Sequence, residues 1–413
     1  MEDFIREQIK DKPLNKKRIA IKLGVSALCG LVFALVACII FALLLPRLTK
    51  ENEQMPSDTQ QESLTEIETE TQQDTQIASE DPTVETIIQS LTIDDYQHLQ
   101  NELYAIGSEA NKSVVTITGV VSDTDWFNNS YESEYQGAGV IIKDTGSEYL
   151  ILTEKKNFNN AEELSVTFVN DVVVEATMKK YDGNTGIAIV SVNKADIADS
   201  TLSTISVAEF GNSNSVNKGQ ITIALGSPLG TNYSILTGNI TSTNNEISTL
   251  DDNYTVFTTD IVASQNGSGV LINLDGEVIG LVMQDYNKSD SDNTLTAVAI
   301  SEVEPMIDLL MDGKDVPYIG LYVTPVTEKI AKAHDLPNGL YVKDVKMDSP
   351  AMLAGIQSGD VITQIDGTDV RSVSAYNSKL LTLSVGDTVK VTVMRKGNDG
   401  YSEITCQVEI GVL

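Results

Sequence analysis

The sequence predicts a mainly β protein that follows an N-terminal membrane-spanning helix. From Ser113 to about residue 300 the chain consists of short apolar or alternating segments, such as "SVVTITGVV" and "QITIALG", separated by Gly, Asn, Asp and Ser. Many short strands with turn residues between them are typical of a β-barrel or β-sandwich. Residues 316–413 hold further strand-like segments, with helices expected at Ser349–Gly355 and Ala375–Leu383. A length of 413 residues suits two folded domains plus accessory segments.

The expected membrane span is Leu23–Leu45, a segment without any charged residue. As a helix it covers roughly 34 Å, enough for the hydrocarbon core of a bilayer. Its length and the lack of a small-residue cleavage site favour a signal anchor over a cleaved signal peptide. Lys16, Lys17, Arg18 and Lys22 precede it. Because basic residues gather on the cytoplasmic side of a span, these four residues place the N-terminus in the cytoplasm and the rest of the chain outside.

The charge balance excludes nucleic acid as a partner. Lys plus Arg total 28 and Asp plus Glu total 59, a formal net charge of −31. Such a surface repels phosphate backbones. Residues 46–92 are rich in Glu, Gln, Thr, Ser and Asp, which predicts a disordered acidic linker. A short amphipathic helix is expected at residues 93–112, before the strands begin.

Neither metal nor organic cofactor is expected. The three cysteines have no metal-binding or redox spacing, and Cys406 is interpreted as a small buried hydrophobic residue. Several aspartates lie in turn-like segments and are interpreted as solvated turn residues rather than calcium ligands. They are Asp251, Asp252, Asp285, Asp290 and Asp292.

Several motifs in order identify a family resemblance. They are "SVVTITG", "GAGVII" (137–142), "IALGSPLG" (223–230), "SILTGNITS" (234–242), "TTD" (258–260) and "LINLDGEVIGL" (271–281). Over about residues 100–410 the chain resembles the HtrA/Deg family of membrane-tethered, trypsin-like serine proteases. The resemblance implies a chymotrypsin-like double β-barrel followed by a PDZ domain. The implied division is 1–22 cytoplasmic tail, 23–45 transmembrane anchor, 46–92 linker, 93–313 protease-fold domain and 314–413 PDZ domain.

The same resemblance places other residues at all three triad positions. The family motif Leu-Thr-Asn-Asn-His-Val-Val corresponds to "LTEKKNF", with Lys156 at the histidine. In "DGNTGIAIV" Gly186 stands at the catalytic aspartate, and Asp182 is the upstream turn aspartate of the motif. In "QNGSGVLIN" Gly267 stands at the serine, and Ser268 follows it.

The predicted oxyanion-hole loop and the positions of the histidines also disfavour protease activity. Gln265 replaces a glycine of the oxyanion-hole loop, which needs two fixed backbone N–H groups. The chain has two histidines, His98 and His334, and both lie outside the expected barrel strands. Because triad members act as a unit, loss of one leaves little for the others to contribute.

One enzymatic alternative stays open, in which Lys156 acts as the base for Ser268. A lysine base must be desolvated to lose its proton near neutral pH. Glu154 and Lys155 beside it predict an exposed, charged loop, which disfavours that role.

The last domain offers a peptide site. "YIGLYV" resembles the carboxylate-binding loop and groove strand of a PDZ domain, with the N–H groups of Ile319, Gly320 and Leu321 facing a peptide C-terminus. The second helix would supply the other wall of the groove. The expected peptide-binding residues are Tyr318, Ile319, Gly320, Leu321, Tyr376, Lys379 and Leu380.

Together these inferences predict a single-pass bacterial membrane protein with both folded domains outside the cytoplasm. It is expected to be a pseudoprotease that binds exposed or unfolded polypeptide C-termini in envelope protein quality control or regulation. The alternative is an active serine endopeptidase that uses Ser268 and Lys156. The resemblance also implies a homo-oligomer, such as a trimer, or a hetero-oligomer with active relatives.

Overall fold

The computed structural model describes residues 92–124, 130–159, 161–287 and 293–413. The expected cytoplasmic tail, the anchor at 23–45 and the linker up to residue 91 lie outside these residues. Within the described ranges, no helix is both long enough and apolar enough to span a bilayer.

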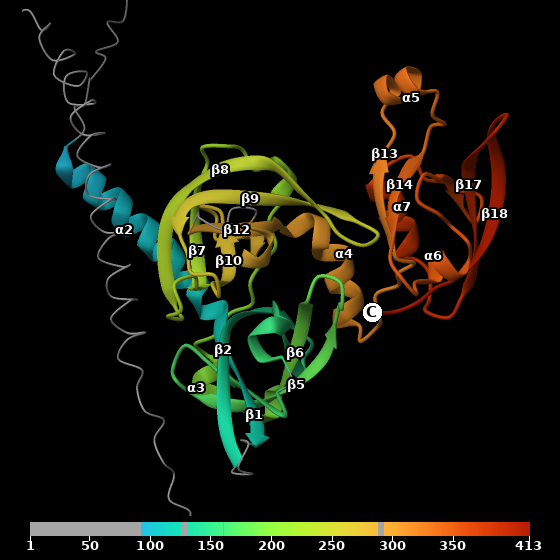
Figure 1. The fold of residues 1–413 in the computed structure, drawn as a ribbon. Coiled ribbons are helices and arrows are strands. Elements are labelled where there is room, and N and C mark those ends of the chain that lie inside the picture. Colours follow the sequence, from blue (N-terminus) through green and yellow to red (C-terminus); the bar gives the residue numbers. More distant parts are fainter. Residues whose placement is uncertain (1–91, 125–129, 160, 288–292) are drawn as a thin grey trace, which may run out of the picture. The chain divides into compact units, whose positions relative to one another are not determined.

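Six strands form a first closed barrel (Figure 1). They are β1 (Val114–Thr124), β2 (Ser130–Asp144), β3 (Glu148–Glu154), β4 (Glu163–Thr167), β5 (Val173–Tyr181) and β6 (Ile187–Asn193). Each pairs antiparallel with its neighbours in the order β1-β2-β3-β6-β5-β4. Successive strand residues face opposite sides, so alternate apolar residues fill the interior. Val115, Ile117, Ile141, Ile151 and Val190 belong to this core.

A second closed barrel follows in the same chain. Its strands are β7 (Ile221–Ser227), β8 (Ser234–Ser248), β9 (Asn253–Val262), β10 (Ser268–Ile272), β11 (Val278–Val282) and β12 (Thr294–Ala299). Outward-facing residues of both barrels meet in one apolar cluster, to which Val140 on β2 and Val270 on β10 both belong. The cluster brings β10 close to β2. The predicted mainly β class and double barrel are confirmed.

Two helices cover apolar edges of the barrels. α2 (Ile93–Ala110) corresponds to the helix expected at 93–112 and buries Leu103 and Gly107. A capping box between Thr92 and Asp95 fixes its first turn. α4 (Ile300–Met311) buries Ile300, Val303, Met306, Ile307 and Leu310, which recur at helical spacing on one face.

The C-terminal domain is a six-stranded sheet with short helices. The strands are β13 (Leu321–Pro325), β14 (Leu340–Val345), β15 (Val361–Ile365), β16 (Thr368–Asp369), β17 (Thr388–Gly397) and β18 (Gly400–Glu409). α6 (Pro350–Leu353) lies within the first predicted helix. Cys406 is buried and free, as expected.

Two details of this domain differ from the sequence prediction. α7 spans Val373–Leu380, because the Ser372 side chain accepts a hydrogen bond from the Ala375 amide and starts the helix early. α5 (Glu328–His334) is absent from the prediction, since none of its residues is buried and so short a segment has no core-facing stripe to recognise.

Candidate functional site

Ser268 is locked into the strand that it begins. Its side chain is 2 % exposed, and its Oγ accepts a hydrogen bond of 2.9 Å from the Ala138 amide on β2. Gly269 beside it has φ +132°, and a Cβ there would lie 1.9 Å from the Leu225 carbonyl oxygen. A Cβ on Gly267 would lie 2.7 Å from the Pro228 carbonyl oxygen. Close backbone packing therefore explains both glycines around Ser268. It also directs the hydroxyl toward β2.

The amide at the expected nucleophile position is already engaged. The Gly267 N–H donates to the Ser264 carbonyl at 2.9 Å, and the Ser264 N–H donates to the Pro228 carbonyl at 2.8 Å. An oxyanion hole needs N–H groups that point at the substrate oxygen. In this loop the Gly267 N–H closes a turn instead. Gln265 is exposed.

Lys156 is held between two carboxylates. It lies in a 3₁₀ turn at Lys155–Phe158, where its Nζ is 3.1 Å from Glu154 Oε1 and 3.2 Å from Asp285 Oδ1. Both ion pairs direct the Lys156 side chain toward carboxylates of its own barrel turn and of the second barrel. Among the described residues no hydrogen bond joins the Lys156 ammonium to the Ser268 hydroxyl.

The prediction of an exposed charged loop around Lys156 is wrong. Lys155 and Lys156 are only partly exposed, and the Lys156 Nζ itself is buried. The prediction fails most clearly for Glu154. Its side chain is 4 % exposed at the end of β3. Burial raises the pKa of the Glu154 carboxyl to about 7, and the Lys156 ammonium only partly opposes this. Close packing of the turn causes the burial: a Cβ on Gly137 of β2 would lie 2.4 Å from the Asn157 side chain.

Gly186, at the expected aspartate position, closes a tight turn before β6. Its φ is +78°, a conformation that favours glycine, and its carbonyl accepts the Lys155 amide at 2.8 Å. The buried Asp182 carboxylate accepts 2.7 Å bonds from both the amide and the hydroxyl of Thr185. The structure therefore brings Lys155 and Gly186 together, and it gives Asp182 the role of a turn residue.

Both histidines lie outside the barrels. His98 is exposed on α2 and His334 is exposed on α5. The sequence has no other histidine. Ser268 therefore has no imidazole partner within its own barrel.

The predicted carboxylate-binding loop, Tyr318–Leu321, holds a carboxylate from the same chain. Asp251 Oδ2 accepts the amides of Ile319 and Gly320, each at 2.8 Å, and its Oδ1 accepts the amide of Leu321 at 3.0 Å. The Tyr376 hydroxyl donates to Oδ1 at 2.5 Å. The sequence predicts the three amides as donors to a carboxylate, and it places Tyr376 in the groove wall without predicting this hydrogen bond. It missed the acceptor.

The interpretation of Asp251 and Asp252 as solvated turn residues is wrong. They are 3 % and 8 % exposed, respectively. Burial raises the pKa of the Asp251 carboxyl, against the opposing effect of its four hydrogen bonds. Burial and the Asp251 charge raise the pKa of Tyr376 well above its ordinary value. Asp285 is exposed as expected, and Asp290 and Asp292 lie outside the described residues.

The remaining expected groove residues surround this contact. Leu380 and Tyr376 on α7 are buried in the core of the C-terminal domain, and Lys379 is partly exposed. Tyr318 pairs through its backbone with Gly411, which holds the start of the loop. Gly320 has φ +93°, and a Cβ there would lie 2.4 Å from the Ser349 Cβ, so the loop requires glycine at this position.

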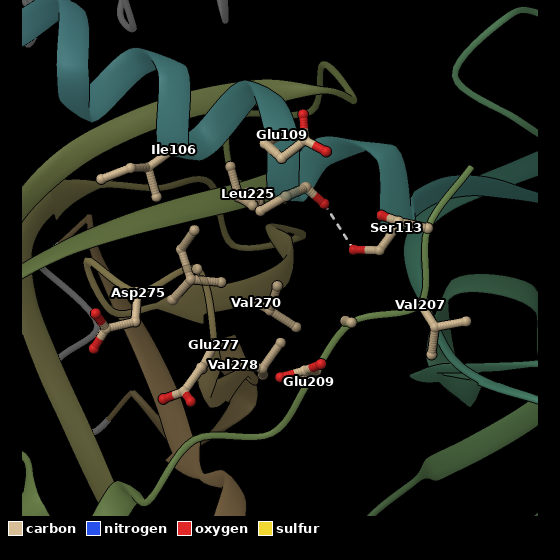
Figure 2. Close-up of a pocket in the computed structure, with 15 residues that line it drawn as sticks. Ile106, Glu109, Ser113, Val207, Glu209, Leu225, Val270, Asp275, Glu277 and Val278 are labelled. Atoms are coloured by element: carbon tan, nitrogen blue, oxygen red, sulfur yellow. Dashed lines mark hydrogen bonds between the residues drawn. The ribbon is translucent and has the colours of Figure 1, made fainter. Parts of the chain in front are cut away.

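A separate cavity of about 370 Å³ lies between α2 and the second barrel. Figure 2 shows the carboxylates of Glu109, Glu209, Asp275 and Glu277 around an apolar lining that includes Val270. None of the expected site residues lines it. In the described part of the chain, no three His, Cys, Asp or Glu side chains form a cluster that could hold a metal ion.

Comparison with known proteins assigns both folded domains. A trypsin-like peptidase domain matches residues 137–281 and a PDZ domain matches residues 317–405. The chain is 31 % identical to "Serine protease Do-like HtrA" of Lactobacillus helveticus over 66 % of this chain and 68 % of that protein. It is also 31 % identical to "Serine protease Do-like HtrB" of Bacillus subtilis, over 63 % of this chain and 59 % of the relative.

Solved structures share the fold. "HtrA-type protease AlgW with decapeptide" superposes with a TM-score of 0.55 at 19 % identity, covering 75 % of this chain and 98 % of that one. The serine endoprotease from Yersinia pestis gives a TM-score of 0.50 at 23 % identity with the same coverage. The two barrels, the C-terminal domain and the sequence relatives agree, and the chain belongs to the HtrA family of trypsin-like serine proteases with a PDZ domain.

Proposed function

We propose that this protein is a membrane-anchored HtrA-type pseudoprotease that binds exposed or unfolded polypeptide C-termini through its PDZ domain. The observation that carries the proposal is the absence of any histidine between His98 and His334 in the sequence, a stretch that includes every barrel strand. Without an imidazole, a serine hydroxyl in the barrel lacks the base that a family protease uses.

The geometry around Ser268 supports the same proposal. Its Oγ accepts the Ala138 amide, the Gly267 N–H is used in a turn, and Lys156 is paired with Glu154 and Asp285. A serine–lysine mechanism would need each of these groups released. The relatives are named as proteases. Under this proposal the chain shares their fold but does not catalyse their reaction.

Peptide binding is the activity that remains. Three convergent amides and a tyrosine hydroxyl form a site that accepts a carboxylate. A peptide that adds as a strand beside β13 would place its C-terminal carboxylate at Ile319, Gly320 and Leu321. The anchor at 23–45 would hold this site outside the cytoplasm, close to the membrane, in a role in envelope protein quality control or regulation.

The test of the pseudoprotease proposal uses the full-length chain in detergent micelles. Fluorescent casein measures turnover, and a fluorophosphonate probe measures labelling of a reactive serine. The variants are Ser268→Ala and Lys156→Ala, with Lys194→Ala as a control because Lys194 pairs with Asp144 on the outside of the first barrel. Circular dichroism establishes that each variant is folded.

We expect neither cleavage nor labelling in any of these proteins. Cleavage and labelling that are lost in Ser268→Ala and Lys156→Ala but kept in Lys194→Ala would overturn the proposal. They would establish the serine–lysine endopeptidase instead.

A further inference from the structure

We propose that Asp251 is an internal ligand of the PDZ domain, so that a peptide C-terminus binds only by displacing it. This inference rests on the proposed peptide-binding function and adds its regulation. A side-chain carboxylate of the second barrel occupies the carboxylate-binding loop, 68 residues before its first amide partner in the sequence.

The contact reproduces what a bound C-terminus requires. Both oxygens of the Asp251 carboxylate are used, and they receive three backbone N–H groups and the Tyr376 hydroxyl. The Asp251 N–H also donates to the Leu321 carbonyl at 2.7 Å. A terminal residue that adds as a strand needs the same two components, a carboxylate in the loop and an N–H to the groove strand.

The hairpin that carries Asp251 is built to present it. Ser248 at the end of β8 pairs with Asn253 at the start of β9, so residues 249–252 form the tip. The Thr249 N–H and hydroxyl both donate to the Asp252 carbonyl, at 2.9 and 3.1 Å. Asp251 takes φ +61°, a left-handed conformation that aspartate tolerates better than most residues. The turn thereby directs this side chain away from its own strands.

Two carboxylates cannot use the same amides. Each amide has one hydrogen to donate, and the four donors are already satisfied by Asp251. A second anion would also meet the charge of Asp251 in a buried site, where repulsion is stronger than in water. An incoming C-terminus must therefore move the hairpin tip out of the loop. The apparent affinity for peptide is therefore the intrinsic affinity multiplied by the fraction of molecules in which the tip already lies outside the loop.

Two readouts on the full-length chain in detergent micelles test this proposal. Hydrogen exchange, read from the peptic fragment that contains residues 318–321, reports whether the loop amides are occupied. Fluorescence anisotropy reports binding of labelled decapeptides that end in Val, Leu, Ile or Phe with a free carboxylate. The same decapeptides with an amidated end serve as the ligand control.

The variants distinguish the effect of the Asp251 carboxylate from the effect of the backbone conformation of the hairpin tip. Asp251→Asn keeps the shape of the side chain but replaces one acceptor oxygen with a donor that faces the loop amides. Asp251→Gly removes the side chain and accepts the left-handed φ. Asp252→Asn is the matched control, since Asp252 belongs to the same tip but its carboxylate accepts the Asn253 amide, at 2.8 Å, and not a loop amide.

We expect exchange in the loop fragment to increase by at least about tenfold in Asp251→Asn and Asp251→Gly but not in Asp252→Asn. Peptides with a free carboxylate should bind Asp251→Gly at least about tenfold more tightly than wild type, as expected if the tip fills the loop nine-tenths of the time. Unchanged loop exchange in both Asp251 variants would overturn the proposal, and so would equal peptide affinity in wild type and Asp251→Gly. Faster exchange with no binding of any peptide would support the internal ligand and refute the proposed peptide-binding function.

Discussion

Replacing Gly320 with alanine should lower the free energy of unfolding, because an added side chain is strained and also clashes in the carboxylate-binding loop. The residue has φ +93°, so a side chain is strained there by roughly 1–3 kcal/mol. An added Cβ would also lie 2.4 Å from the Ser349 Cβ, an atom fixed by its own backbone, and such overpacking costs about 1–3 kcal/mol. The two effects sum to roughly 2–6 kcal/mol. The Gly320 amide, which binds a carboxylate oxygen, would shift with them.

Gly359→Ala is a matched control for this substitution. Gly359 has φ +94°, nearly the value of Gly320, but no atom lies within 4 Å of its added Cβ. Urea unfolding followed by circular dichroism should give a loss of roughly 1–3 kcal/mol for Gly359→Ala from strain alone. Gly320→Ala should lose roughly 1–3 kcal/mol more, from the clash with Ser349. Equal losses in the two variants would refute the reasoning, because the contact with Ser349 would then impose no constraint.

Two further predictions concern buried charge. Burial raises the pKa of Glu154 from 4.5 to about 7, so the folded state holds a proton that the unfolded chain has released. Its stabilising effect is complete below pH 4.5 and is lost as the pH rises through 7, a change of about 3 kcal/mol. Glu154→Gln should flatten the fall in unfolding free energy between pH 5 and 8, and an unchanged slope would contradict the assignment. Asp360 is 1 % exposed and accepts two 2.7 Å bonds from Arg395. Asp360→Asn should cost about 3 kcal/mol in urea unfolding, whereas Asp369→Asn, which breaks the exposed pair of Asp369 and Arg371, should cost much less. Similar losses in both variants would show that burial does not set the strength of these pairs.

The fold and the donors of the groove could be predicted from the sequence because both depend on local pattern. Strand alternation and turn residues indicated a barrel or sandwich, and the resemblance to HtrA proteases specified two barrels and a PDZ domain. Tyr318–Leu321 identified the loop amides, since a glycine between apolar residues at that point is part of the family motif. The early start of α7 depends on one cap, Ser372, which a periodicity argument does not weigh.

The acceptor in the loop could not be predicted in this way. "LDDN" at residues 250–253 has the composition of an exposed turn, and aspartates are mostly exposed unless they are paired. Its partners lie about seventy residues away, and nothing in the local sequence indicates them. Glu154 was misjudged for the same reason. Its charged neighbours suggested solvent, while the glycine that lets its turn pack closely, Gly137, lies on another strand.

The turn at the expected aspartate position also contacts the tip that fills the loop. Asn184 lies between Asp182 and Gly186, and its side-chain amide donates to the Leu250 carbonyl at 3.0 Å while its Oδ1 accepts the Leu250 amide at 3.3 Å. Leu250 directly precedes Asp251. Because Asp182 is fixed on Thr185 and Gly186 closes the turn, Asn184 has a defined position from which to hold the tip. A peptide that displaced Asp251 would therefore pull on Leu250 and on the turn that carries Gly186. Two hydrogen bonds and one hairpin thus link the carboxylate in the loop to the turn at the expected aspartate position.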